Sequence, residues 1–380
     1  MTIIAVTTKG DNATDNAIAI EYADLESNDA DAWNGELSAS STGRIQQTVQ
    51  GARIRWSMDG QRPLFLRARC GDETAGQLYM HRGFVHPDLL QWAQPLLKTA
   101  FMHRLFGVVS WFGGPVVHRR DRYEEVLRAF LAQVDDFCIR RDVAMVRNAT
   151  PAFCGNESDW DRIDAIFAEF AYRKKERATI ALAVDADQEA LWSGLSKEAR
   201  QKVRKADRQG IRVFQDNSAA GLERYYQVRL QTAGRNGLRP PSRSSILAVE
   251  PVYMGDGMCK LFLAEHEGHV VGGQLLVVFN GYVQLAGICY SDRARQLKLA
   301  CNDLLQWEVI KWAQDSGHRH VDWSGFTPNP TSEKEAGINR FKEKWGGEVV
   351  HYHDYDKILA PRRYNGLEWI KGRARRFNVR

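Results

Sequence analysis

The sequence predicts an α+β protein of two domains, each with a mostly antiparallel mixed sheet flanked by helices. Its 380 residues are long for one core and suit two domains of about 150–200 residues each. Hydrophobic residues make up 44% and charged residues 26% of the chain, proportions that are ordinary for a folded protein. Strand-like and helix-like apolar spacings follow one another in a similar order in both halves, although the sequence itself shows no repeat.

The first half begins with an acidic lead-in over residues 9–36, which we expect to be loose around one strand at residues 17–22. Apolar patterns of the strand type predict further strands at 62–69, 76–84, 108–112 and 143–147. Apolar residues at helical spacing predict helices over 88–106 and 121–141.

The second half shows a clearer version of the same order. Strands are predicted at 178–184, 211–214, 259–265, 269–279, 282–290, 320–323 and 348–354. Helices are predicted at 187–209, 222–232, 299–316 and 331–345. We place the domain boundary near residues 172–177, which gives domains over 1–176 and 177–361 and a basic tail over 362–380. Helices, an antiparallel meander, then alternating helices and strands are the layout of the GNAT acyltransferase fold, so we expect two GNAT-like domains.

Composition and motifs exclude several classes of protein. The six cysteines are scattered without a C-x-x-C pair, and His351 and His353 would share a strand face without a third ligand, so we expect no metal. No apolar run is long enough to span a bilayer, and the N-terminus lacks the basic region of a signal peptide, so we expect a cytoplasmic protein with reduced thiols. G-x-S-x-G, H-E-x-x-H and P-loop motifs are absent.

The segment from Leu195 to Val213 crowds six cations onto one predicted helix. They are Lys197, Arg200, Lys202, Arg204, Lys205 and Arg208. Positions 200, 204 and 208 fall on one helical face, and such a row repels itself unless an anion lies against it. Because the guanidinium fork matches phosphate oxygens, we take Arg200 and Arg204, with the neighbouring cation Lys205, as substrate-binding candidates. The alternative is a solvated face whose cations favour the helix dipole near Gly210.

A second candidate segment runs from Asn339 to Gly347 and ends in a glycine pair. Phe341 and Trp345 are one turn apart and are expected to pack inward, which directs Lys342 sideways. We take Lys342 as a catalytic group that stabilises an oxyanion or a phosphate, and Phe341 as a substrate-binding residue. The alternative is an amphipathic helix with a glycine stop.

Asp322 ends a predicted strand and precedes Trp323-Ser324-Gly325. A carboxylate at a strand end beside a glycine is well placed for chemistry, so we take Asp322 as a catalytic candidate that organises the attacking amine. Capping of the following loop is the alternative.

A further segment bears on the acyl donor. GNAT acetyltransferases bind the pyrophosphate of CoA on a loop of the type [Q/R]-x-x-G-x-[G/A], whose N–H groups point at the phosphates from a helix N-terminus. Residues 295–300 occupy the corresponding place, with Lys298 at the glycine position. A side chain there obstructs a close approach of the backbone to a pyrophosphate, which disfavours acetyl-CoA as the donor.

Three places in the chain resemble signature segments of the Fem-type aminoacyltransferases, the peptidoglycan-bridge enzymes. Residues 45–55 are similar to the segment Q-[ST]-x-x-W-x-x-x-K, with Gln47-Thr48 in register and Arg55 in the place of the lysine. Residues 179–184 and 195–213 resemble the family's strand and basic helix. The third match joins 322–325 with 340–347, and the resemblance extends over residues 33–360.

This resemblance implies an aminoacyl-tRNA as donor, a muropeptide acceptor bound through its diphosphate, and a new peptide bond on a side-chain amine. It places Arg55 and Arg204 among the diphosphate contacts, and Phe341 and Lys342 at the acceptor peptide and the reaction centre. The long helical hairpin that some members insert has no counterpart here, because residues 222–240 are too short for it.

We therefore hypothesise an acyltransferase that needs no cofactor and joins an aminoacyl group from aminoacyl-tRNA to an amine of a phosphorylated or lipid-linked, cell-wall-type or peptide acceptor. One alternative is an acyl-CoA-dependent N- or O-acyltransferase of exopolysaccharide or cell-envelope biosynthesis, with acetyl-CoA as co-substrate. The other is a non-catalytic membrane- or RNA-binding protein that uses the basic clusters.

The tail after residue 361 is strongly basic. Its cations are Arg362, Arg363, Lys371, Arg373, Arg375, Arg376 and Arg380, opposed by Glu368. As a helix, the tail would suit an anionic surface at the inner face of the membrane or the phosphates of tRNA. Packing of a final helix on the first domain is the alternative.

Overall fold

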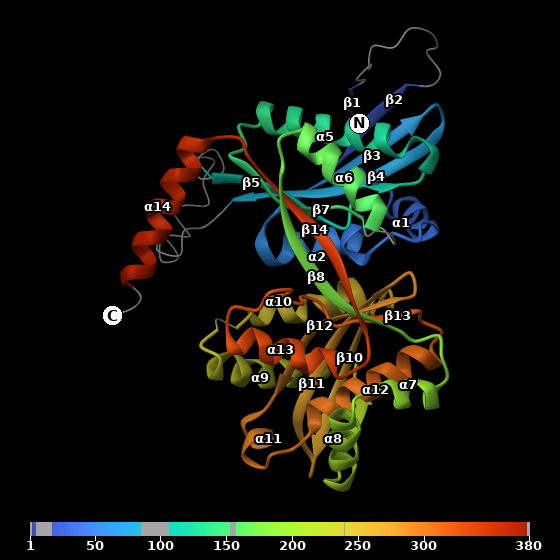
Figure 1. The fold of residues 1–380 in the computed structure, drawn as a ribbon, viewed down its shortest axis with the longest axis vertical. Helices are drawn as coiled ribbons and strands as arrows, with labels where there is room; N and C mark the ends of the chain where they lie inside the picture. Colours follow the sequence, from blue (N-terminus) through green and yellow to red (C-terminus); the bar gives the residue numbers. More distant parts are fainter. Residues whose placement is uncertain (1, 5–16, 85–105, 153–156, 239, 378–380) are drawn as a thin grey trace. The chain divides into compact units, whose positions relative to one another are not determined.

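The computed structural model describes residues 2–4, 17–84, 106–152, 157–238 and 240–377. By its internal contacts the chain divides into two units (Figure 1). The first consists of Met1–Glu176 with Tyr352–Arg380, and the second of Arg177–His351. The strands follow one another in a single hydrogen-bonded order, and the part of it within each unit is that unit's sheet. Each unit has a hydrophobic core of its own.

The sheet of the first unit is antiparallel except where β5 runs parallel to β7. Its strand order is β1 (Thr2–Ile4), β2 (Ile18–Ala23), β3 (Arg62–Cys70), β4 (Glu73–Phe84), β5 (Gly107–Phe112), β7 (Met145–Thr150) and β14 (Glu348–Ile358), and β6 (Val116–Val117) pairs with β4. The helices are α1 (Ala30–Ala39), η1 (Ile45–Gln47), α2 (Val49–Asp59), η3 (Arg120–Arg122), α5 (Tyr123–Arg140), α6 (Glu157–Glu169) and α14 (Pro361–Phe377).

The core of the first unit forms where α5 covers this sheet. Val126, Phe130 and Val134 are fully buried, and their spacing follows the apolar stripe predicted for residues 121–141. Each fully buried side chain of this kind contributes about 1.5–3 kcal/mol. Gly76 of β4 lets the helix approach, because a Cβ there would lie 3.0 Å from Val126 Cγ1.

The sheet of the second unit is antiparallel except for the parallel pair β12 and β13. Its order is β8 (Arg173–Ala183), β13 (His320–Asp322), β12 (Tyr282–Tyr290), β11 (His269–Phe279), β10 (Cys259–His266) and β9 (Arg212–Gln215). The helices are α7 (Gln188–Gly194), α8 (Lys197–Arg208), α9 (Ala219–Arg235), α10 (Arg243–Leu247), η4 (Glu250–Met254), α11 (Asp292–Gln296), α12 (Cys301–Asp315) and α13 (Glu333–Glu343).

Two adjacent glycines let helices pack closely on both faces of this second sheet. A Cβ on Gly272 would lie 3.2 Å from the side chains of Cys301 and Leu305 on α12. A Cβ on Gly273 would lie 2.8 Å from Tyr225 on α9. Because successive strand residues point to opposite faces, α12 and α9 cover opposite sides of β11.

The predicted fold class is confirmed, since both units are mixed, mostly antiparallel sheets with flanking helices. The helix predicted over 187–209 is wrong in one respect, because it is two helices. Ser196 interrupts it: the Ser196 side chain caps α8 at Ala199 N, and the Ser196 N–H donates to Lys344 O at 2.9 Å. The expected loose lead-in also contains α1, which begins where Asp29 accepts from Asp31 N and Ala32 N.

Other differences concern segment ends. The sequence boundary at residue 361 differs from the structural one after His351, because β14 passes into the first unit. Helix α6 had no predicted counterpart. The tail begins as α14, whose Leu367 is buried against Val108 and Met145 of the first unit. The helix expected over 88–106 lies almost entirely outside the described residues.

Candidate functional site

The residues singled out around Asp322 and Lys342 meet at one turn of the second unit. Strand β13 pairs with β12 only as far as Asp322 and Gln284, and the chain turns away after Asp322. The Asp322 carboxylate is 3% exposed. It accepts hydrogen bonds from Thr179 Oγ1, from Tyr282 Oη at 2.8 Å and from the Ser324 N–H at 2.6 Å.

These contacts bear on the pKa of Asp322. Burial raises the pKa of Asp322, and the three hydrogen bonds and the charge of Lys342 oppose that rise. These donors enclose the carboxylate and hold it at the turn. The role of Asp322 as the group that organises the amine stays a prediction.

The turn itself consists of two left-handed residues, Ser324 with φ 53° and Gly325 with φ 46°. Lys342 holds it from α13, because its Nζ donates to the carbonyl oxygens of both residues. Burial lowers the pKa of Lys342, and the negative charge of Asp322 opposes that effect. An ammonium has three N–H donors, so one remains for a ligand at this turn.

Strand β12 carries a β-bulge beside the turn. Leu275 of β11 pairs with Gly287 while Leu276 pairs with Leu285, so Ala286 is an extra, exposed residue. Ser324 Oγ donates to Leu285 O at 3.3 Å, which fixes the turn against the bulge. Bulges of this kind disrupt the ladder locally and re-aim side chains, and they often lie next to active sites.

A chain of buried hydrogen bonds links the residue after Asp322 to the β-bulge of β12. Trp323 Nε1 donates to Gln306 Oε1 at 2.8 Å, and Gln306 Nε2 donates to Gln274 Oε1 at 3.0 Å. Gln274 Nε2 in turn donates to Gly287 O at 2.9 Å, within the bulge. All three side chains are buried.

The two signature segments of the second unit come together at the end of α13. The Ser196 N–H donates to Lys344 O at 2.9 Å. Gly346 has φ 84°, and a Cβ on it would lie 2.8 Å from Gly194 O, so only glycine allows this approach. Trp345 is fully buried and Phe341 packs beside it with a centroid distance of 6.1 Å. The predicted inward packing of these two rings is confirmed.

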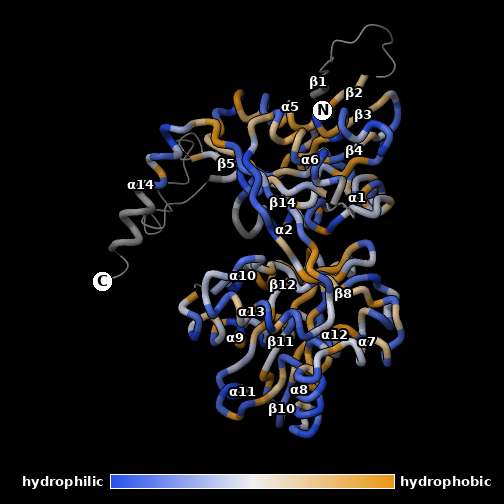
Figure 2. Tube along the Cα trace, in the orientation of Figure 1, coloured by the Kyte–Doolittle hydropathy of each residue, from blue (hydrophilic) through white to orange (hydrophobic). Residues whose placement is uncertain are grey.

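The cations of α8 have different roles. Figure 2 shows α8 as a hydrophilic segment. Arg200 Nη1 donates to Ser193 O at 2.7 Å and Leu195 O at 2.8 Å, so it caps α7 instead of facing a ligand. The Arg204 guanidinium is exposed and lies 5.6 Å from the Trp192 ring centroid, which leaves its N–H edges toward solvent. Lys205 Nζ donates to Lys298 O at 3.0 Å.

That last contact belongs to the loop at residues 295–300. Lys298 has φ 51°, a left-handed conformation that suits a glycine. The N–H groups of this loop are used internally: Leu299 N donates to Ala294 O at 2.9 Å and Ala300 N donates to Gln209 Oε1 at 3.1 Å. Asp303, in the first turn of α12, forms an ion pair with Lys344. The loop therefore has a left-handed residue at Lys298, and its Leu299 and Ala300 amides are already hydrogen-bonded within the second unit.

In the first unit, Gln47 and Thr48 anchor the start of α2, the helix that carries Arg55. The Gln47 side chain is fully buried between two strands, where it accepts from Tyr79 N at 2.7 Å and donates to Phe112 O at 2.8 Å. Thr48 caps α2 by accepting from Gly51 N at 3.0 Å. Helix α2 then presents Arg55 at the surface. Burial, with the nearby charge of Arg55, lowers the pKa of His81 to about 3.

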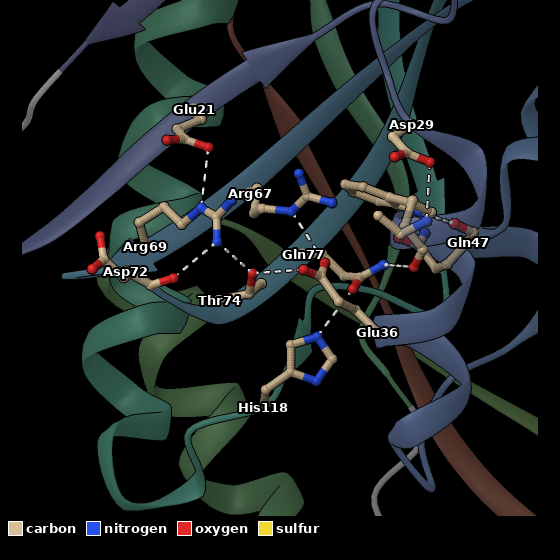
Figure 3. Close-up of polar contacts among 12 residues, drawn as sticks. Glu21, Asp29, Glu36, Gln47, Arg67, Arg69, Asp72, Thr74, Gln77 and His118 are labelled. Atoms are coloured by element: carbon tan, nitrogen blue, oxygen red, sulfur yellow. Dashed lines mark hydrogen bonds and ion pairs between the residues drawn. The ribbon is translucent and has the colours of Figure 1, made fainter.

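Polar contacts also tie α1 to this sheet (Figure 3). Glu36 accepts from Arg67 Nε at 3.1 Å and from Thr74 Oγ1 at 2.8 Å. Gln77 is fully buried and bonds His118 Nε2 at 3.0 Å. The Glu36 contacts join α1 to β3 and β4.

Among the described residues there is no group of three metal-ligating side chains. His353 is engaged with Asp164, at 2.8 Å between Nδ1 and Oδ1. No helix in the described part of the chain is long and apolar enough to cross a membrane.

Residues 193–343 match the model of an acetyltransferase (GNAT) domain. The solved structure of FemX matches with a TM-score of 0.72 and 15% identity, over 91% of this chain and 99% of FemX. The chain has the fold of FemX. The Fem-type, GNAT-like resemblance expected from three sequence segments is thus confirmed at the level of the fold.

Two further structures share this fold. The tandem GNAT protein from the clavulanic acid biosynthesis pathway has a TM-score of 0.54 and 14% identity, over 89% of this chain and 98% of that one. L-PGS from Bacillus licheniformis has a TM-score of 0.50 and 15% identity, over 85% of this chain and 92% of that one. No curated protein matches the sequence.

Sequence reasoning missed several residues of this candidate site. Thr179 and Tyr282 hold Asp322 from distant strands, and no local pattern marks either one. Ser324 could have been found, since it follows a strand-end carboxylate and precedes a glycine. Gln274 and Gln306 carried a signal as polar residues within otherwise apolar patterns.

Proposed function

We propose that this protein is an aminoacyl-tRNA-dependent aminoacyltransferase that forms an amide bond on an amine of a phosphorylated or lipid-linked, cell-wall-type or peptide acceptor. The observation that carries the proposal is the half-buried Lys342 ammonium, which keeps one N–H for a ligand at the Ser324–Gly325 turn. The fold shared with FemX and L-PGS supports it.

The proposed reaction is the transfer of an activated acyl group. The neutral acceptor amine attacks the ester carbonyl carbon of the aminoacyl-tRNA and a C–N bond forms. The C–O bond to the ribose then breaks, and the amine proton ends on the released ribose oxygen. The remaining Lys342 N–H donates to the oxyanion between these steps, in a site shielded enough to strengthen that hydrogen bond.

The positions of Arg55, Arg204 and Phe341 support their proposed roles with the acceptor. The guanidinium groups of Arg55 and Arg204 both lie at the surface, where an acceptor phosphate can reach them. Phe341 precedes Lys342 on α13 and is half-buried, with its ring packed against Trp345. Arg200 and Lys205, by contrast, support α7 and the loop at Lys298.

A second candidate is an acyl-CoA-dependent N- or O-acyltransferase. The match of residues 193–343 to a GNAT domain favours it, as does the left-handed backbone at Lys298. Against it stand the internal hydrogen bonds of the loop at residues 295–300 and the carboxylate of Asp303 close to the helix N-terminus. We therefore rank it second, and propose no bound cofactor.

The test supplies both donors to the same protein. Purified protein is incubated with radiolabelled aminoacyl-tRNA or radiolabelled acetyl-CoA, together with muropeptide, lipid-linked and peptide amines. We expect label from aminoacyl-tRNA, and a drop of roughly 100- to 1,000-fold in Lys342→Ala, as for loss of one oxyanion donor. Lys334→Ala, an exposed lysine on the same helix, serves as the matched control.

The outcomes separate the hypotheses. Transfer from acetyl-CoA alone would establish the second candidate. No transfer from either donor, with intact binding to vesicles or RNA, would make the protein a non-catalytic binding module. Because Lys342 also holds the turn, the melting temperatures of both lysine variants are compared with that of the wild type.

A further inference from the structure

A pocket of about 190 Å³ in the first unit takes no part in the proposed reaction. Its floor is one face of three neighbouring strands, β7, β14 and the start of β8, whose residues up to Glu176 belong to the first unit. Alternate residues of these strands line it: Met145 and Arg147, Asp356 and Ile358, Arg173 and Lys175. Tyr364 and Glu368 of α14 complete the lining. The volume is below that of a drug-sized site and suits a small polar group.

The cations of this pocket suit a phosphate. Within the described part of the chain, Arg147 and Arg173 make no hydrogen bond or ion pair with another residue, and both are exposed. Lys175 pairs with Asp356, which also accepts from Asn148 N at 2.9 Å. Two guanidinium groups without carboxylate partners, directed into one small concavity, match the oxygens of a single phosphate.

The same pocket also holds carboxylates and apolar surface. Asp356 and Glu368 would repel a polyanion such as RNA, but they can accept hydrogen bonds from the hydroxyl groups of a polyol. Ile358 is 36% exposed and Tyr364 half-buried, which gives an apolar rim. A phosphate with adjacent hydroxyls and an acyl chain fits this combination better than a nucleic-acid backbone.

Helix α14 points to where such a ligand would come from. Tyr364 and Leu367, in the first half of α14, pack with Val108 and Met145 of the first unit. Trp369, on another side of the helix, is 61% exposed. Indole rings beside basic residues are typical of the membrane–water interface. The sequence then continues with Lys371, Arg373, Arg375 and Arg376.

We propose that this pocket binds the phosphate and hydroxyl groups of a phosphatidylglycerol headgroup while α14 lies on the anionic membrane surface. Arg147 and Arg173 contact the phosphate, Asp356 and Glu368 accept from the headgroup hydroxyls, and Trp369 enters the interface. This docking goes beyond the proposed function, since it holds whichever acyl donor the second unit uses.

Co-sedimentation with vesicles tests it. The full chain is mixed with vesicles of phosphatidylcholine alone, or with phosphatidylglycerol added. We expect binding only to the latter, and a loss of roughly 10- to 30-fold in the double variant Arg147→Ala, Arg173→Ala, given about 1 kcal/mol per basic residue near such a surface. Arg53→Ala, Arg62→Ala is the control, because it removes the same charge from exposed positions of the same unit.

Two results would overturn the proposal. One is equal vesicle binding by the pocket variant and the control variant, at matching melting temperatures. The other is loss of tRNA binding by the pocket variant in filter assays while its vesicle binding stays unchanged, which would identify an RNA surface. Trp369→Ala must also weaken binding to the anionic vesicles, and an unchanged affinity there contradicts the placement of α14.

Discussion

At the residue scale, the site rests on two ionisable groups that burial affects in opposite ways. Asp322 is enclosed by hydroxyl and amide donors and its pKa is raised, whereas Lys342 loses part of its hydration and its pKa is lowered. The charge of Lys342 partly offsets the effect of burial on the pKa of Asp322, and the charge of Asp322 does the same for Lys342. The sequence could place both at the site, but it could not show that Asp322 faces inward, because its partner Thr179 is 143 residues away.

A raised pKa makes the stability contribution of Asp322 dependent on pH. A group whose folded pKa exceeds its usual 3.8 stabilises the fold below that value, and this contribution is lost as pH rises through the folded pKa. Asparagine does not titrate and keeps an acceptor for Thr179 Oγ1 and Ser324 N. The free energy of unfolding of the wild type relative to Asp322→Asn should therefore fall as the pH rises above the usual pKa of 3.8 and through the raised folded pKa. Urea denaturation across this range measures it, and a rise would contradict the assignment.

At the scale of the element, helix caps and hydrogen bonds from distant segments determine where helices begin and end. Strand and helix identities followed from apolar spacing, and most predicted elements of the second unit are present. The break between α7 and α8 was missed because residues 187–209 contain no proline and keep a helical pattern. Its causes are the Ser196 cap and the bond from Ser196 N–H to Lys344 O, and the latter depends on a distant segment.

Arg200 illustrates the same limit, and its role can be tested. The guanidinium donates to carbonyls at the end of α7, so Arg200→Ala should destabilise the protein by about 1.5–3 kcal/mol, as for hydrogen bonds to charged groups. Arg208→Ala, on the same helix and exposed, should stay within about 0.5 kcal/mol of the wild type. Equal stability of the two variants in denaturant titrations would return Arg200 to the substrate-binding candidates.

In the first unit, the buried Gln47 side chain joins the backbones of two strands. Its side chain bonds Tyr79 N, Tyr79 O and Phe112 O inside the sheet, so Gln47→Ala leaves buried polar backbone groups unpaired. We expect a loss of about 2–4 kcal/mol, with direct consequences for α2 and Arg55. Thr48→Ala, which removes only a helix cap, should cost about 1 kcal/mol. Thermal unfolding of both variants measures the two losses of stability. A smaller loss for Gln47→Ala than for Thr48→Ala would contradict the structural role of the Gln47 side chain.

At the scale of the whole molecule, the excess of positive over negative charge comes from the C-terminal end of the sequence. The net charge is +5, and residues 371–380 contain Lys371, Arg373, Arg375, Arg376 and Arg380 and no acid. Without those ten residues the formal net charge is 5 − 5 = 0. These last residues therefore carry the whole formal excess of positive charge, which contributes to long-range attraction to a polyanionic surface.

Deletion of residues 371–380 should weaken binding to anionic vesicles or to tRNA and flatten its dependence on salt. Replacement of Asn378 and Val379 by alanine leaves the charge unchanged and should have no such effect. Co-sedimentation and filter binding at low and physiological ionic strength make the comparison. Identical salt dependence in the deleted and intact chains would limit α14 to packing.

The left-handed backbone at Lys298 bears on how donor preference evolves in this fold. The loop already follows the path that a glycine would take, and a lysine there retains a strain of about 1 kcal/mol. Under our proposal, Lys298→Gly would relieve that strain, and loss of the Gln209 side chain would release the Ala300 amide. Both changes lie near the surface and leave the core untouched. Under our proposal the Asp303 carboxylate would still lie beside the helix N-terminus, so a third side chain would have to change before this loop suited a pyrophosphate.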